Sequence, residues 1–358
     1  MSGLSTLFEG VEDRRAPNVS HKLCDLLVIM VAATLCGQVT ATDMALFAAH
    51  RKDVLNRIVA YDHAPSHDTI SRVLRLVEPK AFGEVFAVFM TGFAKAVAAH
   101  GGADIVALDG KSLRRAYESG RAHAPPLMVS AFDCRLRLCI AMGEPAPGKG
   151  EVDAALRVVE LLDLTGKIIT ADALHCTHEM TRALTAKKAD YVIGLKKNRP
   201  AWFAEAKALF AVADAKGGLA CASLNEPDHH YTADVIAAPE PLCAGHAAFG
   251  RVVSCHREKA PVTRLFMMSR RFEPGQLIDI ARSHWAIENN LHWILDVHLG
   301  EDLIRARKDH APANIALVKR IARNILQTLD LAKTPISHRI RKCMWNDDYL
   351  INALTHMR

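Results

Sequence analysis

Glu288 is an acidic residue whose place in the sequence suggests chemistry. It lies in the stretch 282–302, which contains no proline, carries apolar residues such as Ile287 and Leu291 at helical spacing, and stops at Gly300. On such a helix Glu288 falls at the edge of the apolar stripe, where an unpaired carboxylate is costly. A carboxylate held beside a core suits a divalent cation, provided that further carboxylates reach the same point from elsewhere in the chain.

Two further acids follow apolar segments that read as strands. Asp109 comes directly after residues 105–108, and Asp172 comes directly after residues 168–171. An acid at the carboxyl end of a strand lies at the mouth of a sheet, where open α/β sheets bind ligands. If these two strands are neighbours, both carboxylates face one point. Glu288 could then complete a set that holds two divalent ions with water and phosphate oxygens.

Basic residues stand close to these acids in the sequence. Lys111 and Arg114 follow Asp109, and Lys196 follows a later predicted strand, so all three are predicted to contact phosphate groups. Taken alone, an aspartate after a strand is most often a turn former or a helix cap. Three acids accompanied by basic residues favour a phosphate-handling site instead.

The composition indicates a soluble globular protein with a moderate basic excess. The chain has 358 residues, of which 50% are hydrophobic, a net charge of +6 and a pI of about 8.8. This balance suits a polyanion such as DNA, and it equally fits a mildly basic cytosolic enzyme. Nine cysteines without a C-x-x-C pair indicate reduced thiols in a cytoplasm. We expect neither a signal peptide nor a membrane span, since the apolar run 26–36 is too short.

Residues 1–100 are expected to be all-helical. Apolar spacing predicts helices at 23–36, 41–60, 66–77 and 79–100. The second and third could form a helix-turn-helix, in which Ser66 caps the later helix and Arg72 faces DNA. The alternative is an ordinary helical bundle with exposed polar positions.

The rest of the chain predicts a mixed α/β architecture. After residue 101 we expect strands at 103–108, 127–132, 136–142, 167–171 and 190–195, with helices at 151–162 and 177–189. A helix near 201–213 and strands at 231–238, 251–256 and 263–269 indicate a β-rich insertion before Glu288. The chain ends in a basic helical region that includes a helix at 314–332.

Four strings in the sequence resemble one known family. They are Leu-Asp-Gly-Lys-Ser-Leu-Arg at 108–114, Thr-Ala-Asp-Ala-Leu-His at 170–175, Asp-Tyr-Val-Ile-Gly-Leu-Lys-Lys-Asn at 190–198 and His-Trp-Ala-Ile-Glu-Asn-Asn-Leu-His-Trp-Ile-Leu-Asp-Val at 284–297. Over nearly the whole chain they resemble the DDE insertion-sequence transposases, specifically the group that includes the H-repeat-associated proteins. The fourth string is long and specific.

The resemblance implies a ribonuclease H-like core in which Asp109 and Asp172 are the strand acids and Glu288 is the helix acid. It implies cleavage and joining of DNA ends with two Mg²⁺ or Mn²⁺ ions. The expected partners are the terminal inverted repeats and target DNA, bound by a homodimer in the cytoplasm, at the nucleoid.

Five segments follow from the combined reading. They are a helical DNA-binding region at 1–100, the first part of the core at 101–197, the β-rich insertion at 198–275, the second part of the core with the catalytic helix at 276–335, and a basic C-terminal tail at 336–358.

The family signature around the last acid, Tyr-x2-Arg-x3-Glu-x6-Lys, is not matched here. The chain has Ala281, His284 and Leu295 at its other three positions. The phosphate contact of the missing arginine is therefore assigned to His284 or to Arg282.

Several alternative readings of the same residues stay open. His284, Glu288 and His292 are spaced to share one helix face and could bind zinc, although the H-E-x-x-H spacing is absent. A second soft site could form at 175–178. The third acid could be Asp296, Glu301 or Asp302 in place of Glu288, and the tryptophans Trp285 and Trp293 are interpreted as helix packing. At the level of function, the alternatives are an inactive remnant that only binds DNA and a metal-dependent nuclease that does not join strands.

Overall fold

The computed structural model describes residues 3–97, 104–116, 125–257, 259–329 and 334–356. The predicted boundary at 100–101 lies outside the described residues, as do the last residues of the helices predicted at 79–100 and 314–332. The helices are α1 (Gly3–Glu9), α2 (Leu23–Leu35), α3 (Ala41–His50), α4 (Lys52–Leu55), α5 (His67–Leu76), α6 (Pro79–Val97), α7 (Glu151–Glu160), α8 (His178–Ala186), α9 (Pro200–Ala215), α10 (Pro274–Ile287), α11 (Trp293–Val297), α12 (Ala311–Thr328), α13 (Ile336–Trp345) and α14 (Asp347–His356).

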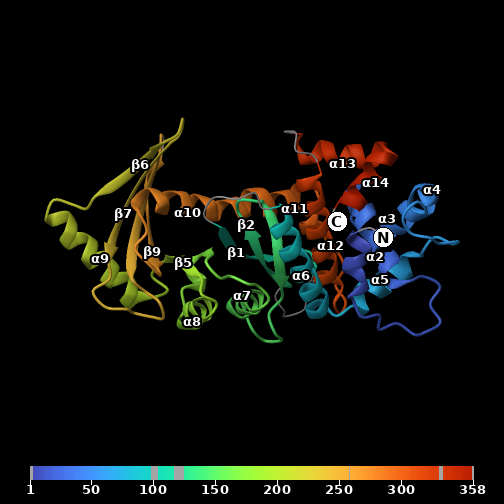
Figure 1. Cartoon of the computed structure of the whole chain (residues 1–358), viewed down its shortest axis with the longest axis horizontal. Coiled ribbons are helices and arrows are strands. Elements are labelled where there is room, and N and C mark those ends of the chain that lie inside the picture. The colour runs from blue at the N-terminus through green and yellow to red at the C-terminus, as the bar shows by residue number, and fades with distance from the viewer. Residues whose placement is uncertain (1–2, 98–103, 117–124, 258, 330–333, 357–358) are drawn as a thin grey trace.

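The described strands form one nine-stranded mixed sheet in the order β3-β2-β1-β4-β5-β9-β8-β7-β6. Their bounds are β1 (Ile105–Ser112), β2 (Leu127–Asp133), β3 (Leu138–Gly143), β4 (Ile168–Ala171), β5 (Asp190–Leu195), β6 (Cys221–Asn225), β7 (His229–Ala237), β8 (Ala248–His256) and β9 (Lys259–Met268). Strands β1, β4 and β5 run parallel, and the other pairings are antiparallel. The molecule is elongated, with β6, β7, β9 and α9 at one end and the terminal helices at the other (Figure 1).

The central strands are apolar on both faces because helices cover both faces of this part of the sheet. All four residues of β4 are buried, as are Val106, Ala107 and Leu108 of β1. Strands β1 and β4 are parallel neighbours, and Leu108 pairs with Ala171. The two strands are thus neighbours, which is the condition for both carboxylates to face one point, and the residues that follow the pair, Asp109 and Asp172, lie at the same level of the sheet.

The β-rich segment before Glu288 extends the central sheet. Strands are present at the three predicted places, and β6 is an additional one. Antiparallel pairing of β9 with β5, from Val192–Met268 to Leu195–Leu265, joins the segment to the core. Without β9, the backbone groups on that side of β5 would form an open edge. The long helix α10 then crosses back along the sheet and packs against β1, β4, β6, β7 and β8 (Figure 1).

The helical half has its own departures from expectation. The helix predicted at 41–60 is divided between α3 and α4, and Thr40 forms a capping box with Asp43. Ser66 caps α5 as predicted, by accepting a hydrogen bond from the Thr69 N–H. The segment 336–358, predicted as a basic tail, instead contains two packed helices. There the buried Arg339 donates to the carbonyl of Leu326.

Helix α12 lies between the terminal helices and the sheet (Figure 1), and every residue from 311 to 326 is buried. Its basic residues are therefore inside the protein. Arg320 pairs with Glu301 at 2.5 Å, and both side chains are fully buried. Asn324 exchanges hydrogen bonds with both backbone groups of Cys139 on the edge strand β3. None of the described helices has the length and hydropathy required to cross a membrane.

The effect of burying charge in α12 on the free energy of unfolding can be tested at Lys319. Burial lowers the pKa of its ammonium group to about 8, against 10.5 for the ordinary group, and the ammonium donates to the Gly300 carbonyl at 2.9 Å. Between these two pH values the unfolded chain binds more protons than the folded one, so stability rises with pH across this window through Lys319. At lower pH, the buried charge reduces stability.

We therefore expect Lys319→Met to be the more stable variant below pH 8. Its advantage in unfolding free energy should shrink by roughly 2–3 kcal/mol as the pH rises from about 8 to about 10.5. Denaturant unfolding of the wild type and of Lys319→Met across this pH range measures the difference in unfolding free energy. The titration of buried thiols and tyrosines is common to both proteins and cancels in that difference. A difference that is independent of pH would contradict the assignment.

Candidate active site

The three predicted acids line one pocket beyond the carboxyl end of β4. The pocket has a volume of about 700 Å³ and includes Asp109, Asp172, Glu288, Lys196 and His284 among its lining residues. The acids come from three elements: β1, the turn after β4, and the turn after α10. The described structure thus brings the three predicted acids to one pocket, together with Lys196 and His284.

The helix around Glu288 contains a π turn. Residues Glu288–His292 have π geometry, and the Trp293 N–H donates to the Glu288 carbonyl five residues earlier. Within this turn the Asn290 carbonyl accepts two hydrogen bonds from the buried Arg323 of α12. Sequence periodicity predicted a regular helix here. Apolar spacing is a local property and does not reveal the hydrogen bonds between Arg323 and the Asn290 carbonyl.

Asp109, Glu288 and His292 form the tightest group at the site. One ligand atom from each lies within 4.8 Å of the others. The Nδ1 atom of His292 is 3.5 Å from Asp109 Oδ2 and 3.4 Å from Glu288 Oε2. Two carboxylates and an imidazole at these separations can hold a divalent cation.

The two carboxylates of this group differ in environment. Asp109 is the less exposed one, with a side chain 15% exposed, whereas the side chain of Glu288 is 60% exposed. Burial, and then the neighbouring Glu288, raise the pKa of Asp109. The imidazole of His292 lowers the pKa of Glu288. The sequence placed Glu288 at the border of the core, but the desolvated acid is the one on the strand.

Asp172 is positioned by the turn that follows β4. Its carboxylate caps the short 3-10 helix Ala173–His175 by accepting from the Leu174 N–H at 2.8 Å. Its Oδ1 also lies 4.0 Å from Nε2 of His175, whose side chain is fully buried. Asp172 lines the same pocket but is not part of the group formed by Asp109, Glu288 and His292.

Glu151 is a fourth acid near the site that sequence reasoning missed. It opens α7, and its Oε1 lies 3.2 Å from His175 Nε2. Its carboxylate rests against Gly110, where an added Cβ would come within 2.4 Å of the Glu151 Cδ, and its charge contributes to the raised pKa of Asp109. An acid in the first turn of a helix is ordinarily explained by the helix dipole, so nothing in the sequence set this one apart.

Lys111, predicted to contact phosphate, is paired with acids of the protein. Its ammonium lies 2.6 Å from Asp296 and 3.7 Å from Asp302, and its side chain is 9% exposed. Arg114 lies 3.8 Å from Asp302 with a guanidinium that reaches into solvent. The two acids considered as rivals of Glu288 therefore neutralise basic residues on β1 and the segment after it. The third rival, Glu301, pairs with Arg320 inside the protein.

The remaining predicted DNA contacts lie in different surroundings. Lys196 is exposed at the pocket, and Arg72 is exposed on α5 at the other end of the molecule. Arg282 forms an ion pair with Glu226 of the strand hairpin β6–β7. His284 lines the pocket, and burial lowers its pKa to about 4, so its imidazole is neutral near pH 7.

The two tryptophans behave differently. Trp285 packs near Tyr231 and lies under the guanidinium of Arg264, 5.0 Å from the ring centre. Trp293 is 53% exposed, and its ring lies edge to face with His298, 5.1 Å between ring centres, so its interpretation as helix packing holds only in part.

The zinc alternatives find no support among the described residues. His284 does not join Glu288 and His292 in a cluster of potential ligands. In the 175–178 segment, His175 faces Glu151 and the thiol of Cys176 contacts Met267. Neither set of groups converges as a tetrahedral zinc site requires.

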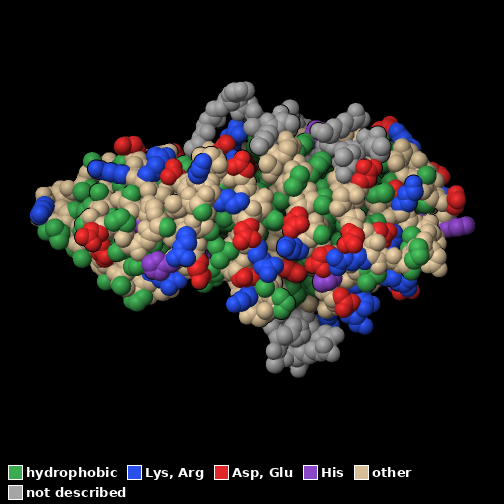
Figure 2. Space-filling model, turned by 60° about the horizontal axis from the view of Figure 1, so that its bottom comes forward, with side chains coloured by type: hydrophobic (Ala, Val, Ile, Leu, Met, Phe, Trp, Pro, Cys, Tyr) green, Lys and Arg blue, Asp and Glu red, His purple; other side chains and the backbone are tan. Residues whose placement is uncertain are grey.

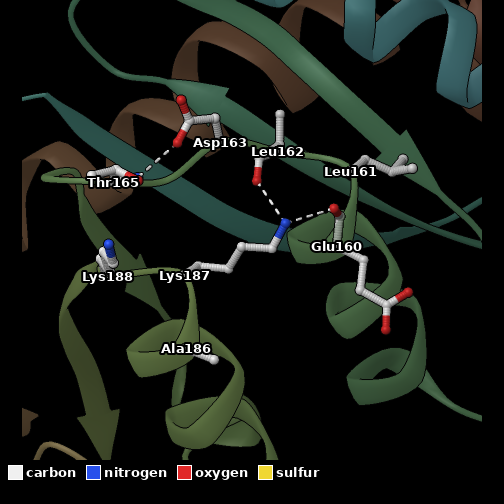
Figure 3. A pocket seen from close by; sticks show the side chains of 8 residues that line it. All are labelled: Glu160, Leu161, Leu162, Asp163, Thr165, Ala186, Lys187 and Lys188. Carbon is white, nitrogen blue, oxygen red and sulfur yellow. Dashed lines mark hydrogen bonds between the residues drawn. The ribbon is translucent and has the colours of Figure 1, made fainter.

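A separate pocket of about 430 Å³ lies at the ends of α7 and α8 (Figure 3). Lys187 crosses it and donates to the carbonyls of Glu160 and Leu162 at 2.8 and 3.0 Å. Its ammonium thus ties the end of one helix to the other. None of the three predicted acids lines this pocket, which we interpret as structural.

The surface charge is mixed. On the face in Figure 2, Lys and Arg side chains are interspersed with Asp and Glu along the length of the molecule. A basic excess of +6 over the chain therefore does not form one continuous basic patch on this face.

Comparison with known sequences identifies the class of protein. The profile described as "Transposase DDE domain" matches residues 100–325, and the profile described as "DDE_Tnp_1-associated" matches residues 5–90. The chain belongs to the DDE transposase family.

Its relatives include two full-length proteins of Escherichia coli K12. "Putative protein YbfL" is 26% identical over 95% of this chain and 94% of its own length, and "H repeat-associated putative transposase YhhI" is 25% identical over the same shares. An uncharacterized protein of Xanthobacter autotrophicus is 34% identical over 54% of this chain and 65% of its own. A solved structure, a piggyBac transposase synaptic complex with hairpin DNA, aligns with 98% of this chain and 77% of the solved chain, at 9% identity and a TM-score of 0.43. This likeness is too weak to support a structural conclusion.

Proposed function

We propose that the protein is a DNA transposase that cleaves element ends and joins them to target DNA by phosphodiester hydrolysis and transesterification. The observation that carries the proposal is the convergence of Asp109, Asp172 and Glu288 on one pocket, from strands β1 and β4 and from the turn after α10. Membership of the DDE transposase family supports it. We further propose a ribonuclease H-like core, supported by the order β3-β2-β1-β4-β5 with β1, β4 and β5 parallel.

The donor set fits divalent cations. Carboxylate oxygens are the ligands that Mg²⁺ and Mn²⁺ prefer, and the buried, crowded Asp109 is a group whose charge such an ion would stabilise. Asp109, Asp172 and Glu288 would hold the ions. Two ions, when bound, lower the pKa of an attacking water or 3′-hydroxyl and stabilise the leaving 3′-oxygen.

The chain's other pocket residues would position the DNA backbone. Lys196 is exposed at the rim and is suited to a phosphate oxygen. His284 offers a neutral imidazole inside the pocket. Lys111 and Arg114 could reach phosphates only by loosening their contacts with Asp296 and Asp302, and Arg282 only by leaving Glu226. Arg72 on α5 lies far along the molecule and would contact a different part of the DNA.

The test uses the full chain with DNA that carries the inverted repeats flanking its gene. We expect end cleavage and strand transfer in Mg²⁺ or Mn²⁺, and none in EDTA. Glu288→Gln should reduce both by at least ~10³-fold, as expected for a member of a catalytic unit. Asp279→Asn, which removes an exposed carboxylate from the same helix α10, is the matched control and should retain activity.

The outcomes separate the competing functions. DNA binding without cleavage in any metal would indicate an inactive remnant. Cleavage without joining would indicate a nuclease. Light scattering of the protein–DNA complex tests the proposed homodimer, for which two chains with two ends are expected.

A further inference from the structure

We propose that His292 is a protein ligand of the divalent ion at Asp109 and Glu288, so that this site has one nitrogen donor as well as carboxylate oxygens. The inference rests on the proposed function, because it assigns a third donor to the cation site of that function. It also predicts the kind of ion that the site prefers.

The first observation is the direction of the imidazole. Nδ1 of His292 lies 3.5 Å from Asp109 Oδ2 and 3.4 Å from Glu288 Oε2, almost equidistant from the two oxygens. Both separations are long for a hydrogen bond of good geometry, which spans about 2.7–3.2 Å. They suit three atoms around one ion, since ligand atoms bound at about 2.0–2.3 Å to a common cation lie roughly 3–3.5 Å apart.

The second observation is burial without another partner. The side chain of His292 is 7% exposed, and its Nε2 atom is buried with no hydrogen-bond partner among the described residues. A buried polar ring is ordinarily held by hydrogen bonds at its nitrogens. Here the polar contacts that the structure does provide all run through Nδ1, toward the two acids. The ring is therefore oriented for these carboxylates, and a function explains that orientation better than packing does.

The third observation is the π turn that sets this geometry. Glu288 and His292 are its first and last residues, and Arg323 of α12 holds it through the Asn290 carbonyl. π turns cost hydrogen-bond quality and are frequently found at functional sites. The turn directs the imidazole of His292 toward the carboxylate of Asp109 on β1. The fold thus supplies the third donor from the same turn as Glu288.

A nitrogen donor has a consequence for metal choice. Mg²⁺ takes oxygen ligands almost exclusively, whereas imidazole binds Mn²⁺ and the later divalent transition metals more readily. We expect the protein to bind Mn²⁺ at least ~10-fold more tightly than Mg²⁺. His292→Gln should weaken Mn²⁺ binding by about 10-fold or more and Mg²⁺ binding by much less.

The experiment is pulsed electron paramagnetic resonance of Mn²⁺ added to the full chain without DNA. Protein with ordinary histidine should show modulation from a directly bound ¹⁴N nucleus, which changes to the ¹⁵N pattern when histidine is ¹⁵N-labelled. This comparison needs no substitution and cannot be confused with misfolding. His292→Gln should bind Mn²⁺ without the nitrogen signal, and His284→Gln, which alters another imidazole at the pocket, should keep it.

Three results are distinguishable. Nitrogen modulation that disappears only in His292→Gln establishes the ligand. Bound Mn²⁺ that Asp109→Asn abolishes, but that lacks nitrogen modulation in the wild type or keeps it in His292→Gln, overturns this inference and leaves the carboxylate site intact. Failure of the wild type to bind Mn²⁺, or binding that Asp109→Asn does not affect, overturns the proposed metal centre and this inference with it.

Discussion

Replacement of Asp109 with Asn is expected to reduce end cleavage and strand transfer by at least ~10³-fold while leaving DNA binding unchanged. A ligand atom of Asp109 lies within 4.8 Å of potential ligand atoms of both Glu288 and His292, and Asp109 lines the pocket with Asp172. Its replacement therefore removes the carboxylate that is common to the proposed cation ligands. Gel-based cleavage assays and a mobility-shift assay on the same DNA measure the two properties.

The same substitution should make the protein more stable. Burial, and then the neighbouring Glu288, raise the pKa of Asp109 to about 8, so at pH 7 this carboxyl must take up a proton when the ion-free chain folds, which costs stability. Asn has nearly the same shape and needs no proton, and we expect it to increase the unfolding free energy by about 1–2 kcal/mol at pH 7. A residue that merely supported the fold would show the opposite sign. Loss of activity together with lowered stability would therefore contradict the assignment.

Asp296→Asn is the matched control for this prediction. Asp296 is a nearby carboxylate on α11, and sequence alone left it as a rival for the third ligand, but its oxygen is engaged by Lys111 at 2.6 Å. We expect this variant to retain cleavage within about 10-fold of the wild type. A loss as large as that of Asp109→Asn would mean that Asp296 takes part in the site.

Glu301→Gln is expected to have the largest effect on stability. Glu301 and Arg320 form an ion pair with both side chains at 0% exposure, and Arg320 also donates to Ser130 and to the Ala316 carbonyl. Removal of the acid leaves the guanidinium buried without its paired carboxylate, and it takes away one of the two acids that act on the nearby Lys319 ammonium. The unfolding free energy should fall by roughly 3–5 kcal/mol, as measured by denaturant unfolding.

The double variant Glu301→Leu with Arg320→Met tests the cause. If the loss comes from an uncompensated buried charge, removal of both charges should recover most of the stability, because apolar residues of similar size often replace a buried ion pair at little cost. Arg320→Met alone should cost less than Glu301→Gln, since Lys319 still faces the acid. Equal losses in all three variants would instead indicate that shape and hydrogen bonding dominate.

Much of the candidate site could be predicted from local sequence. Asp109 and Asp172 follow short apolar strands, and their adjacency was a reasonable expectation for parallel strands that end in acids. The structure confirms that β1 and β4 pair. Apolar periodicity likewise located α2 and α5, and the Ser66 cap was readable because capping depends on residues three positions apart.

Other features depend on contacts between residues far apart in the chain. Glu151 reaches the backbone of Gly110 only because α7 packs against β1 and β2 and starts beside the pocket. The strands β6–β9 extend the central sheet, an arrangement that hydropathy cannot distinguish from a separate unit. Lys319, Arg320 and Arg323 read as surface charge in the sequence, yet they are inside the protein, because Glu301 and backbone carbonyls compensate them.

The sequence by itself determined which charged residues stand at the strand ends and on the helix, because strand and helix periods are local properties of the chain. Only the tertiary structure decided how these residues meet. Arg323, about 30 positions later, donates to the Asn290 carbonyl within the π turn at Glu288–His292, and His292 of that turn lies close to two carboxylates. Such an arrangement follows from packing between distant segments, which residue spacing does not encode.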